Sequence, residues 1–141
     1  MTATIDPTTP AGAHALERLA SERIAWLTTI NPDGQPQSSP IWFRWTDGEL
    51  TIYSRKRAPR NDNIAERPLV SFNLPTDADG DDVVTMEGVA RLDADAPPVT
   101  EDAAYLAKYA GLLAANGWSA EYFAAEYPVV VKVTPTRWRV T

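Results

Sequence analysis

The chain of 141 residues has no cysteine, a single histidine (His14) and no long hydrophobic run. Without thiols it can form no disulfide framework, thiolate nucleophile, cysteine-ligated zinc site or iron-sulfur site. A transmembrane helix needs about 20 consecutive apolar residues, and the N-terminal ten residues are too polar and proline-bounded for a signal peptide. We therefore expect a soluble, cytoplasmic protein that does not bind membranes and has no metal site.

Negative charge predominates, with a formal net charge of -6. Nucleic acid is not expected as a partner, because neutralising its phosphates requires a basic face. Against this background, five of the thirteen Lys and Arg residues fall within positions 55–67. They are Arg55, Lys56, Arg57, Arg60 and Arg67.

This cationic cluster follows a strand pattern. Leu50 and Ile52 alternate with Thr51 and Tyr53, which predicts a half-buried strand ending at Ser54. Cations at a strand end, beside the Ser54 hydroxyl and the Asn61 amide, are suited to hold a phosphate through charge-assisted hydrogen bonds. The alternative is a solvated loop followed by charges on a helix surface.

The rest of the chain predicts a mainly β protein with helices outside the strands. Helices are expected at 13–21, 59–66, 98–110 and 119–126, and strands at 23–30, 35–45, 50–54, 69–74, 83–92 and 128–134. Pro40 suggests an edge, a bulge or a place where something other than a strand comes alongside, and Gly88 suggests a bulge or a close backbone approach. The acidic segment 77–82 does not fit a calcium loop and is predicted to be a hairpin turn. No linker or repeat is present, so we expect an N-terminal arm (1–12) and one domain (13–141).

Six strands joined mostly by short turns predict a small antiparallel barrel with peripheral helices. Several segments, in this order, resemble the pyridoxamine 5'-phosphate oxidase-like split β-barrel family, which binds FMN or the deazaflavin F420. These segments are Trp26 to Pro36, Ser39 to Phe43, Tyr53 to Lys56, Asn61, Pro68 to Phe72 and Gly88 to Ala90. The size of the chain and the closing Pro135 to Trp138 are similar to the actinobacterial F420-dependent branch.

The resemblance implies a cofactor site. Arg55 and Lys56 match the pair that grips the cofactor phosphate, and Arg60 and Asn61 match positions that help with the tail, near Ser54. The strand that lies along the tricyclic ring corresponds to Ser38, Ser39, Pro40, Ile41 and Trp42. Trp138 is a further candidate contact, although barrel packing would also explain Trp42 and Trp138. The family further implies a homodimer with the cofactor sites at its interface, where Trp138 and Trp118 are candidates to cover the partner's cofactor.

The expected function is that of an F420-dependent oxidoreductase that transfers a hydride to an unsaturated or electrophilic small molecule. One alternative is an FMN-dependent flavin reductase or pyridoxamine 5'-phosphate oxidase-like enzyme, and another is a non-catalytic cofactor carrier or sensor. A haem-binding relative is disfavoured because His14 lies outside the barrel motifs. No catalytic acid or base is identified, and Tyr53, Tyr105 and Tyr109 are the remaining candidates as proton donors.

Overall fold

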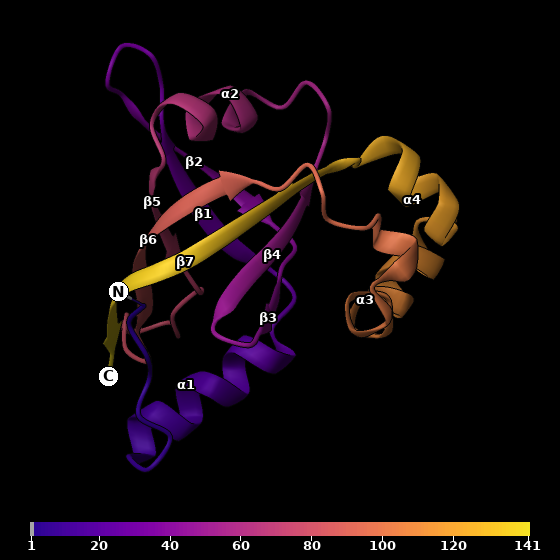
Figure 1. Cartoon of the computed structure of the whole chain (residues 1–141). Coiled ribbons are helices and arrows are strands. Elements are labelled where there is room, and N and C mark those ends of the chain that lie inside the picture. Colours follow the sequence, from indigo (N-terminus) through magenta and orange to yellow (C-terminus); the bar gives the residue numbers. More distant parts are fainter. Residues whose placement is uncertain (1) are drawn as a thin grey trace.

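The computed structural model describes residues 2–141, which form one curled antiparallel sheet with helices around it (Figure 1). Its seven strands run in the order β2-β1-β5-β6-β7-β4-β3. The strands are β1 (Ala25–Ile30), β2 (Pro36–Ile41), β3 (Arg44–Thr46), β4 (Glu49–Ser54), β5 (Leu69–Asn73), β6 (Val84–Leu92) and β7 (Val129–Val140). The helices are α1 (Pro10–Ser21), α2 (Pro59–Glu66), α3 (Ala103–Ala115) and α4 (Ala120–Glu126), with a 3-10 turn, η1 (Val99–Glu101), before α3.

The strand predicted over 35–45 is two strands, which is why the sheet has seven strands and not six. β2 ends at Ile41, β3 begins at Arg44, and the two lie on opposite edges of the sheet. Between them the Phe43 N–H donates to the Tyr109 hydroxyl of α3, at 2.8 Å, instead of to a neighbouring strand. Of the alternatives that Pro40 suggested, the edge is confirmed, since β2 is an edge strand of the sheet.

β4 and β7 differ from their predicted forms. β4 is buried on both faces, not half-buried, with Thr51 1% and Tyr53 7% exposed. Tyr53 packs edge-to-face against Tyr105 of α3 at 4.7 Å, so helices cover a face that the alternation assigned to solvent.

β7 continues past Pro135 because the pairing shifts register between Glu87 and Gly88 of β6. The predicted irregularity at Gly88 is therefore confirmed.

The helices α1, α3 and α4 begin where side chains cap them. The Thr9 hydroxyl accepts a hydrogen bond from the Gly12 N–H, so α1 starts at Pro10, three residues before the predicted start. Ser119 caps α4, at the start of the helix predicted over 119–126. Asp102 caps α3 and separates it from η1, so the helix predicted at 98–110 is displaced to 103–115. Across residues 2–141, no helix has the length and apolar character to cross a membrane.

The acidic segment 77–82 forms a turn, as predicted. Asp77 accepts hydrogen bonds from the backbone N–H groups of Asp79 and Asp81. Asp82 instead contacts α1, with its Oδ2 at 2.9 Å from His14 Nε2 and its Oδ1 at 3.1 Å from Arg18. The single histidine therefore ties a hairpin to a helix.

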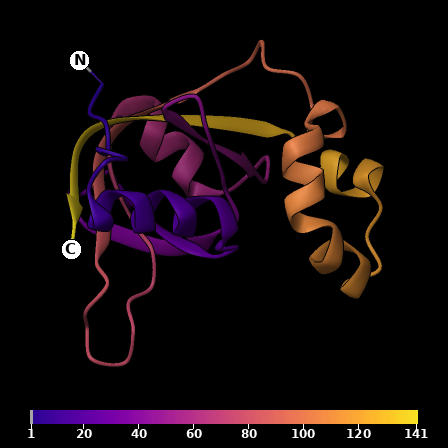
Figure 2. The same ribbon diagram turned by 90° about the horizontal axis from the view of Figure 1, so that it is seen from below.

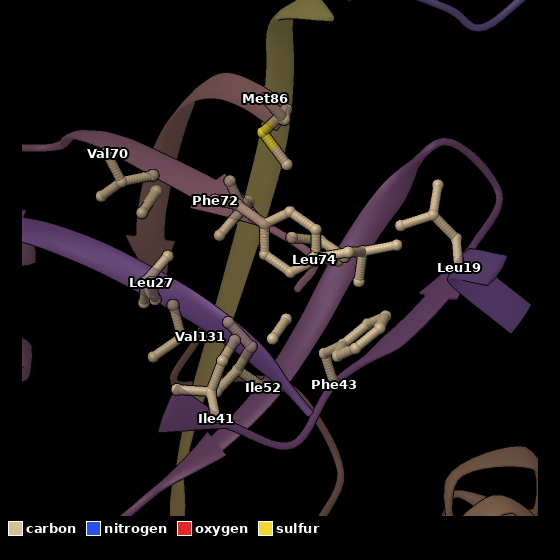
Figure 3. Close-up of a cluster of buried hydrophobic side chains, with 14 of the residues drawn as sticks. Leu19, Leu27, Ile41, Phe43, Ile52, Val70, Phe72, Leu74, Met86 and Val131 are labelled. Carbon is tan, nitrogen blue, oxygen red and sulfur yellow. The ribbon is translucent and has the colours of Figure 1, made fainter. Parts of the chain in front are cut away.

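Two separate hydrophobic clusters hold the fold together. The first fills the barrel, where aliphatic side chains surround Phe43 and Phe72, which pack edge-to-face at 5.2 Å (Figure 3). The second is aromatic and lies between the barrel and the α3–α4 pair. Its buried members are Tyr53, Val99, Tyr105, Tyr109, Leu113, Phe123 and Val130. Figure 2 shows α3 and α4 side by side beyond one end of the barrel.

Substitution by alanine should have opposite effects on stability at Gly88 and at Gly111. A Cβ at Gly88 would lie 2.9 Å from the Thr134 carbonyl oxygen and 2.8 Å from Val133 Cγ1, whereas a Cβ at Gly111, within α3, would meet nothing within 4 Å. We expect Gly88→Ala to lower the free energy of unfolding by about 1–3 kcal/mol, and Gly111→Ala to raise it by about 0.4–1 kcal/mol. Urea denaturation measures both, and a neutral Gly88→Ala would contradict the tight β6–β7 packing.

Candidate functional site

A pocket of about 380 Å³ lies between the barrel and the α3–α4 pair. The pocket is formed by β2 and the segment after it, by the end of β4 and the loop that follows, and by the helices α2, α3 and α4. The lining residues are Pro40, Ile41, Trp42, Tyr53, Arg55, Ala58, Arg60, Tyr105, Asn116, Trp118, Phe123 and Tyr127. Five of the predicted site residues therefore meet here: Pro40, Ile41, Trp42, Arg55 and Arg60.

One side of the pocket, which we call the cationic wall, consists of Arg55, Ala58 and Arg60. Arg55 lies over the ring of Tyr127 at 4.8 Å and forms a 3.5 Å ion pair with the half-exposed Glu126. Arg60 is partly buried, and among residues 2–141 no carboxylate lies within 4 Å of its guanidinium group. Burial lowers the pKa of Arg60, yet an arginine stays charged in proteins. The pocket thus contains a positive charge that no acidic side chain compensates.

The loop behind this wall is shaped by Asn61. The Asn61 side-chain amide donates to the carbonyl oxygens of Arg55, at 2.7 Å, and Lys56, at 3.3 Å. Within the described chain, the buried Asn61 Oδ1 and the buried Ser54 Oγ have no hydrogen-bond partner. Ala58 provides no side-chain cap for α2, whose N-terminus faces this loop. An anion here would meet two guanidinium groups and the positive end of a helix.

The aromatic side chains that line the pocket, which we call the aromatic wall, are Trp42, Tyr53, Tyr105, Trp118, Phe123 and Tyr127, and Tyr127 meets the cationic wall under Arg55. Trp42 stacks in parallel on Tyr109 at 4.7 Å and on Phe123 at 5.6 Å, and Trp118 lies 6.4 Å from it. Trp42 therefore packs against α3 and α4 and also lines the pocket, which combines the two roles considered for it. Trp118, a candidate to cover a partner's cofactor, lies in the pocket of its own chain.

A polar network supports the aromatic wall. Asp102 accepts hydrogen bonds from the Tyr53 hydroxyl at 2.6 Å, from Arg44 Nε at 2.9 Å and from the Tyr105 N–H at 3.0 Å. Burial raises the pKa of Asp102, but these hydrogen bonds outweigh it and the pKa is lowered. Burial, with Asp102, raises the pKa of Tyr53. Sequence reasoning missed Asp102, although an Asp directly before an apolar helical run is a helix-start signal.

Three buried tyrosine hydroxyls were the candidate proton donors, and their surroundings differ. Tyr53 donates to Asp102, and Tyr109 donates to the Arg23 carbonyl at 2.7 Å while accepting from the Phe43 N–H. Tyr105 lines the pocket, and its buried hydroxyl has no hydrogen-bond partner within residues 2–141. Burial raises the pKa of Tyr105, so its hydroxyl keeps its proton.

The remaining predicted site residues lie outside this pocket. Ser38 and Ser39 are on the edge strand β2, where Ser38 Oγ contacts Thr28 Oγ1 at 2.6 Å. Lys56 is exposed in the loop after β4. Trp138 packs edge-to-face on Trp45 at 5.3 Å and lines a second, more open pocket of about 620 Å³ on β5, β6 and β7.

Comparison with known proteins identifies the fold family. The family model described as pyridoxamine 5'-phosphate oxidase matches residues 12–141. The chain belongs to this family. The resemblance inferred from its strand motifs is thereby confirmed, as is the mainly β, split-barrel fold class.

Solved structures agree with this assignment to the pyridoxamine 5'-phosphate oxidase family. A conserved hypothetical protein from Mycobacterium tuberculosis has a TM-score of 0.73 at 23% identity, covering 99% of this chain and 89% of its own. An F420 reductase has a TM-score of 0.63 at 22% identity, with 87% and 94% covered. HutZ, a haem storage protein from Vibrio cholerae, has a TM-score of 0.62 at 16% identity, with 98% and 95% covered. Among curated proteins, no sequence match was found.

Lys108 of α3 predicts a pH dependence for the segment that carries Trp42. Its Nζ donates to the Phe43 carbonyl oxygen at 2.9 Å, and burial lowers the pKa of Lys108 from 10.5 to about 8. Between these pH values the unfolded chain retains a proton that the folded protein has released, so stability rises with pH. Relative to Lys108→Met, the wild-type protein should gain free energy of unfolding as the pH rises from ~8 to ~10.5.

Denaturation by urea across that range measures the difference. Lys56→Met, at an exposed lysine, is the control and should follow the wild-type profile. Parallel profiles for wild type and Lys108→Met would contradict the burial of this ammonium group.

Proposed function

We propose that the chain is an oxidoreductase that binds the phosphate of a deazaflavin cofactor, F420, at the cationic wall. The observation that carries this proposal is Arg60, a partly buried guanidinium in the pocket without an acidic partner in the described chain. An uncompensated, partly desolvated cation attracts an anion more strongly than an exposed one does. Arg55, the N-terminus of α2 and the free hydrogen-bonding groups of Ser54 and Asn61 fit a phosphate and the hydroxyls next to it.

The pocket of about 380 Å³ is near the lower limit of small-molecule sites. It would hold one part of such a cofactor, and the tricyclic ring would extend past Pro40 along the exposed edge of β2, beside Ser38 and Ser39. Both serines are within reach of a ring placed there, as the family resemblance implies. When bound, the reduced deazaflavin supplies the hydride, and the protein supplies the position and the electrostatic environment.

One feature supports F420 over FMN. Arg57 is exposed next to Arg55, and its charge could meet the oligoglutamate tail of F420, which FMN lacks. The fold itself is shared by an F420 reductase and by a haem storage protein. A haem protein is a weaker candidate, because His14 contacts Asp82 and is not among the pocket residues.

Titration with both cofactors distinguishes these functions. Tight binding of F420, weakened by salt, supports the proposal, since exposed ion pairs are screened. Submicromolar binding of FMN with none of F420 would favour the FMN-dependent enzyme. Tight binding of F420 without reduction of any acceptor would favour a carrier or sensor.

Replacing Arg60 tests the phosphate site. Arg60→Met should weaken cofactor binding at least tenfold, because charge-assisted hydrogen bonds contribute about 1.5–3 kcal/mol each, while the Tm without cofactor should change little. Arg91→Met is the control, since Arg91 is exposed on β6 and pairs with Glu49. Lys56→Met tests the pair implied by the family resemblance. Unchanged affinity in Arg60→Met, measured by fluorescence titration, would place the phosphate elsewhere.

We further propose that two copies associate through the open sheet face, defined as the outer side of β1, β5 and β6. Its side chains include Trp26, Leu69 and Val89, which are 41%, 68% and 39% exposed. Leu69 lies directly opposite Val89 in the β5–β6 register, so these two apolar side chains adjoin. Exposed apolar groups that adjoin on one face are typical of interfaces.

Leu69→Arg should therefore convert a dimer into a monomer, because a charge in the centre of an apolar interface is costly to bury. The control is Tyr122→Arg, since Tyr122 is 45% exposed on α4, away from this face. Sedimentation at micromolar concentration measures both variants. A wild-type species at the monomer mass of 15.5 kDa that still binds cofactor would contradict both the dimer and a cofactor site at its interface.

A further inference from the structure

Three cations lie in one row across four neighbouring strands of the sheet. Arg44 of β3 is opposite Thr51 of β4 in the pairing register. Thr51 is in turn opposite Lys132 of β7, and Lys132 is opposite Arg91 of β6. Residues that face each other on neighbouring strands point to the same side of the sheet, and like charges placed directly opposite each other are destabilising. These four residues, which we call the cation row, therefore need negative charge nearby.

Lys132 is the least compensated member of the cation row. Its side chain is only 15% exposed, and Glu49 is the one carboxylate within 4 Å of it in residues 2–141. The Nζ–Oε1 distance of 3.8 Å is too long for a hydrogen bond, and Glu49 is shared with Arg91, at 3.5 Å. Within the described chain Lys132 Nζ donates only to the neutral Thr51 hydroxyl, at 2.8 Å. An ammonium group has three donors, so two of them remain available.

Arg44 is held rigidly beside this ammonium group. Its Nε donates to Asp102 at 2.9 Å, and its Nη2 donates to the same Thr51 hydroxyl at 3.3 Å. The two cations therefore converge on one uncharged oxygen atom. Asp102 offsets the charge of Arg44, but it also accepts from the Tyr53 hydroxyl and the Tyr105 N–H, so its oxygens are already occupied. Arg44 Nη1 has no hydrogen-bond partner within residues 2–141.

A cavity of about 220 Å³ opens beside Arg44 and Lys132. Of the residues that line it, only Tyr53 also lines the larger pocket of the cationic wall. Its volume is below the ~300–1,000 Å³ of sites for drug-sized ligands, so a flavin or a haem does not fit and a small ion does. Glu101 lines it too, but its side chain is exposed, and the repulsion between exposed charges is screened by salt.

We infer that this cavity is a second anion site, which holds a small oxyanion such as inorganic phosphate or a short carboxylate between the Lys132 ammonium group and the Arg44 guanidinium group. Both groups bind phosphate and carboxylate oxygens through charge-assisted hydrogen bonds. The ligand supplies the negative charge that Glu49, shared between two cations, provides only in part. The site goes beyond the proposed function, because neither Arg55 nor Arg60 belongs to it.

Thermal denaturation in inorganic phosphate tests the site, with the ionic strength held constant by sodium chloride. The full chain carries Arg60→Met throughout, so that phosphate bound at the cationic wall does not contribute. We expect a saturable rise in Tm, of about 3–6 °C at about ten times the Kd. Adding Lys132→Met should raise the Kd for phosphate at least about tenfold, because it removes a charge-assisted hydrogen bond.

Two further substitutions separate the loss of charge from the loss of structure. Lys132→Gln keeps a donor for the Thr51 hydroxyl without the charge, and it should abolish the rise as Lys132→Met does. Arg91→Met is the matched control, since Arg91 is an exposed cation of the same row that does not line the cavity, and it should keep the rise. Without phosphate, Lys132→Met should have an unchanged or higher Tm, because the repulsion from Arg91 is removed.

The outcomes also keep this inference apart from the phosphate site at the cationic wall. Absence of a rise in Arg60→Met up to ~10 mM phosphate, or a rise that persists when Lys132→Met is added, would overturn the inference whatever the cofactor titrations show. Normal F420 binding in Arg60→Met would overturn only the phosphate site at the cationic wall. Succinate as a second probe identifies the ligand class: a larger rise than with phosphate assigns the site to carboxylates, and a smaller one assigns it to phosphate.

Discussion

The fold depends on how the chain crosses from one edge of the sheet to the other at Trp42 and Phe43. A strand that ends leaves backbone N–H and C=O groups that must find partners when buried. Here the partners come from α3, where the Tyr109 hydroxyl accepts from the Phe43 N–H and Lys108 donates to the Phe43 carbonyl oxygen. The same two side chains therefore attach the α3–α4 pair to the barrel at the segment that carries Trp42. The pocket exists because the sheet is interrupted at this place.

The pocket combines two kinds of surface that differ in charge. Beside Tyr53 and Tyr105 of the aromatic wall, Arg44 and Asp102 neutralise each other at 2.9 Å. On the cationic wall the charge of Arg60 has no counterpart in the described chain. A buried ion pair satisfies itself, whereas a lone cation is favourable only when a ligand supplies the negative charge. One pocket can thus offer an anion site and an apolar surface for stacking side by side.

Local patterns in the sequence predicted most elements. Alternating apolar residues indicated the strands, Ser119 indicated the start of α4, and Gly88 indicated the bulge. Each of these signals depends on only a few neighbouring residues. The errors have non-local causes. The burial of Tyr53 depends on Tyr105 of α3, about fifty residues further along the chain, and that of Thr51 on Arg44 and Lys132 of the neighbouring strands. The extension of β7 past Pro135 depends on the shift in its pairing with β6. The place of Arg55 and Arg60 in the site could be inferred from their charge. The role of Asp102 and the hydrogen bonds of the three tyrosine hydroxyls could be read only from the structure.

The separation of the two hydrophobic clusters has a consequence for how such a protein can diversify. The aliphatic cluster inside the barrel shares no buried residue with the aromatic cluster under α3 and α4. The two clusters meet where the Tyr109 hydroxyl accepts from the Phe43 N–H. Substitutions of aromatic residues away from this contact should have nearly additive effects on stability with substitutions in the barrel interior. Ligand preference can then drift through Trp118, Phe123 and their neighbours while the scaffold stays constant. A barrel with its own core and a separate helical attachment can thus take different small molecules without being rebuilt.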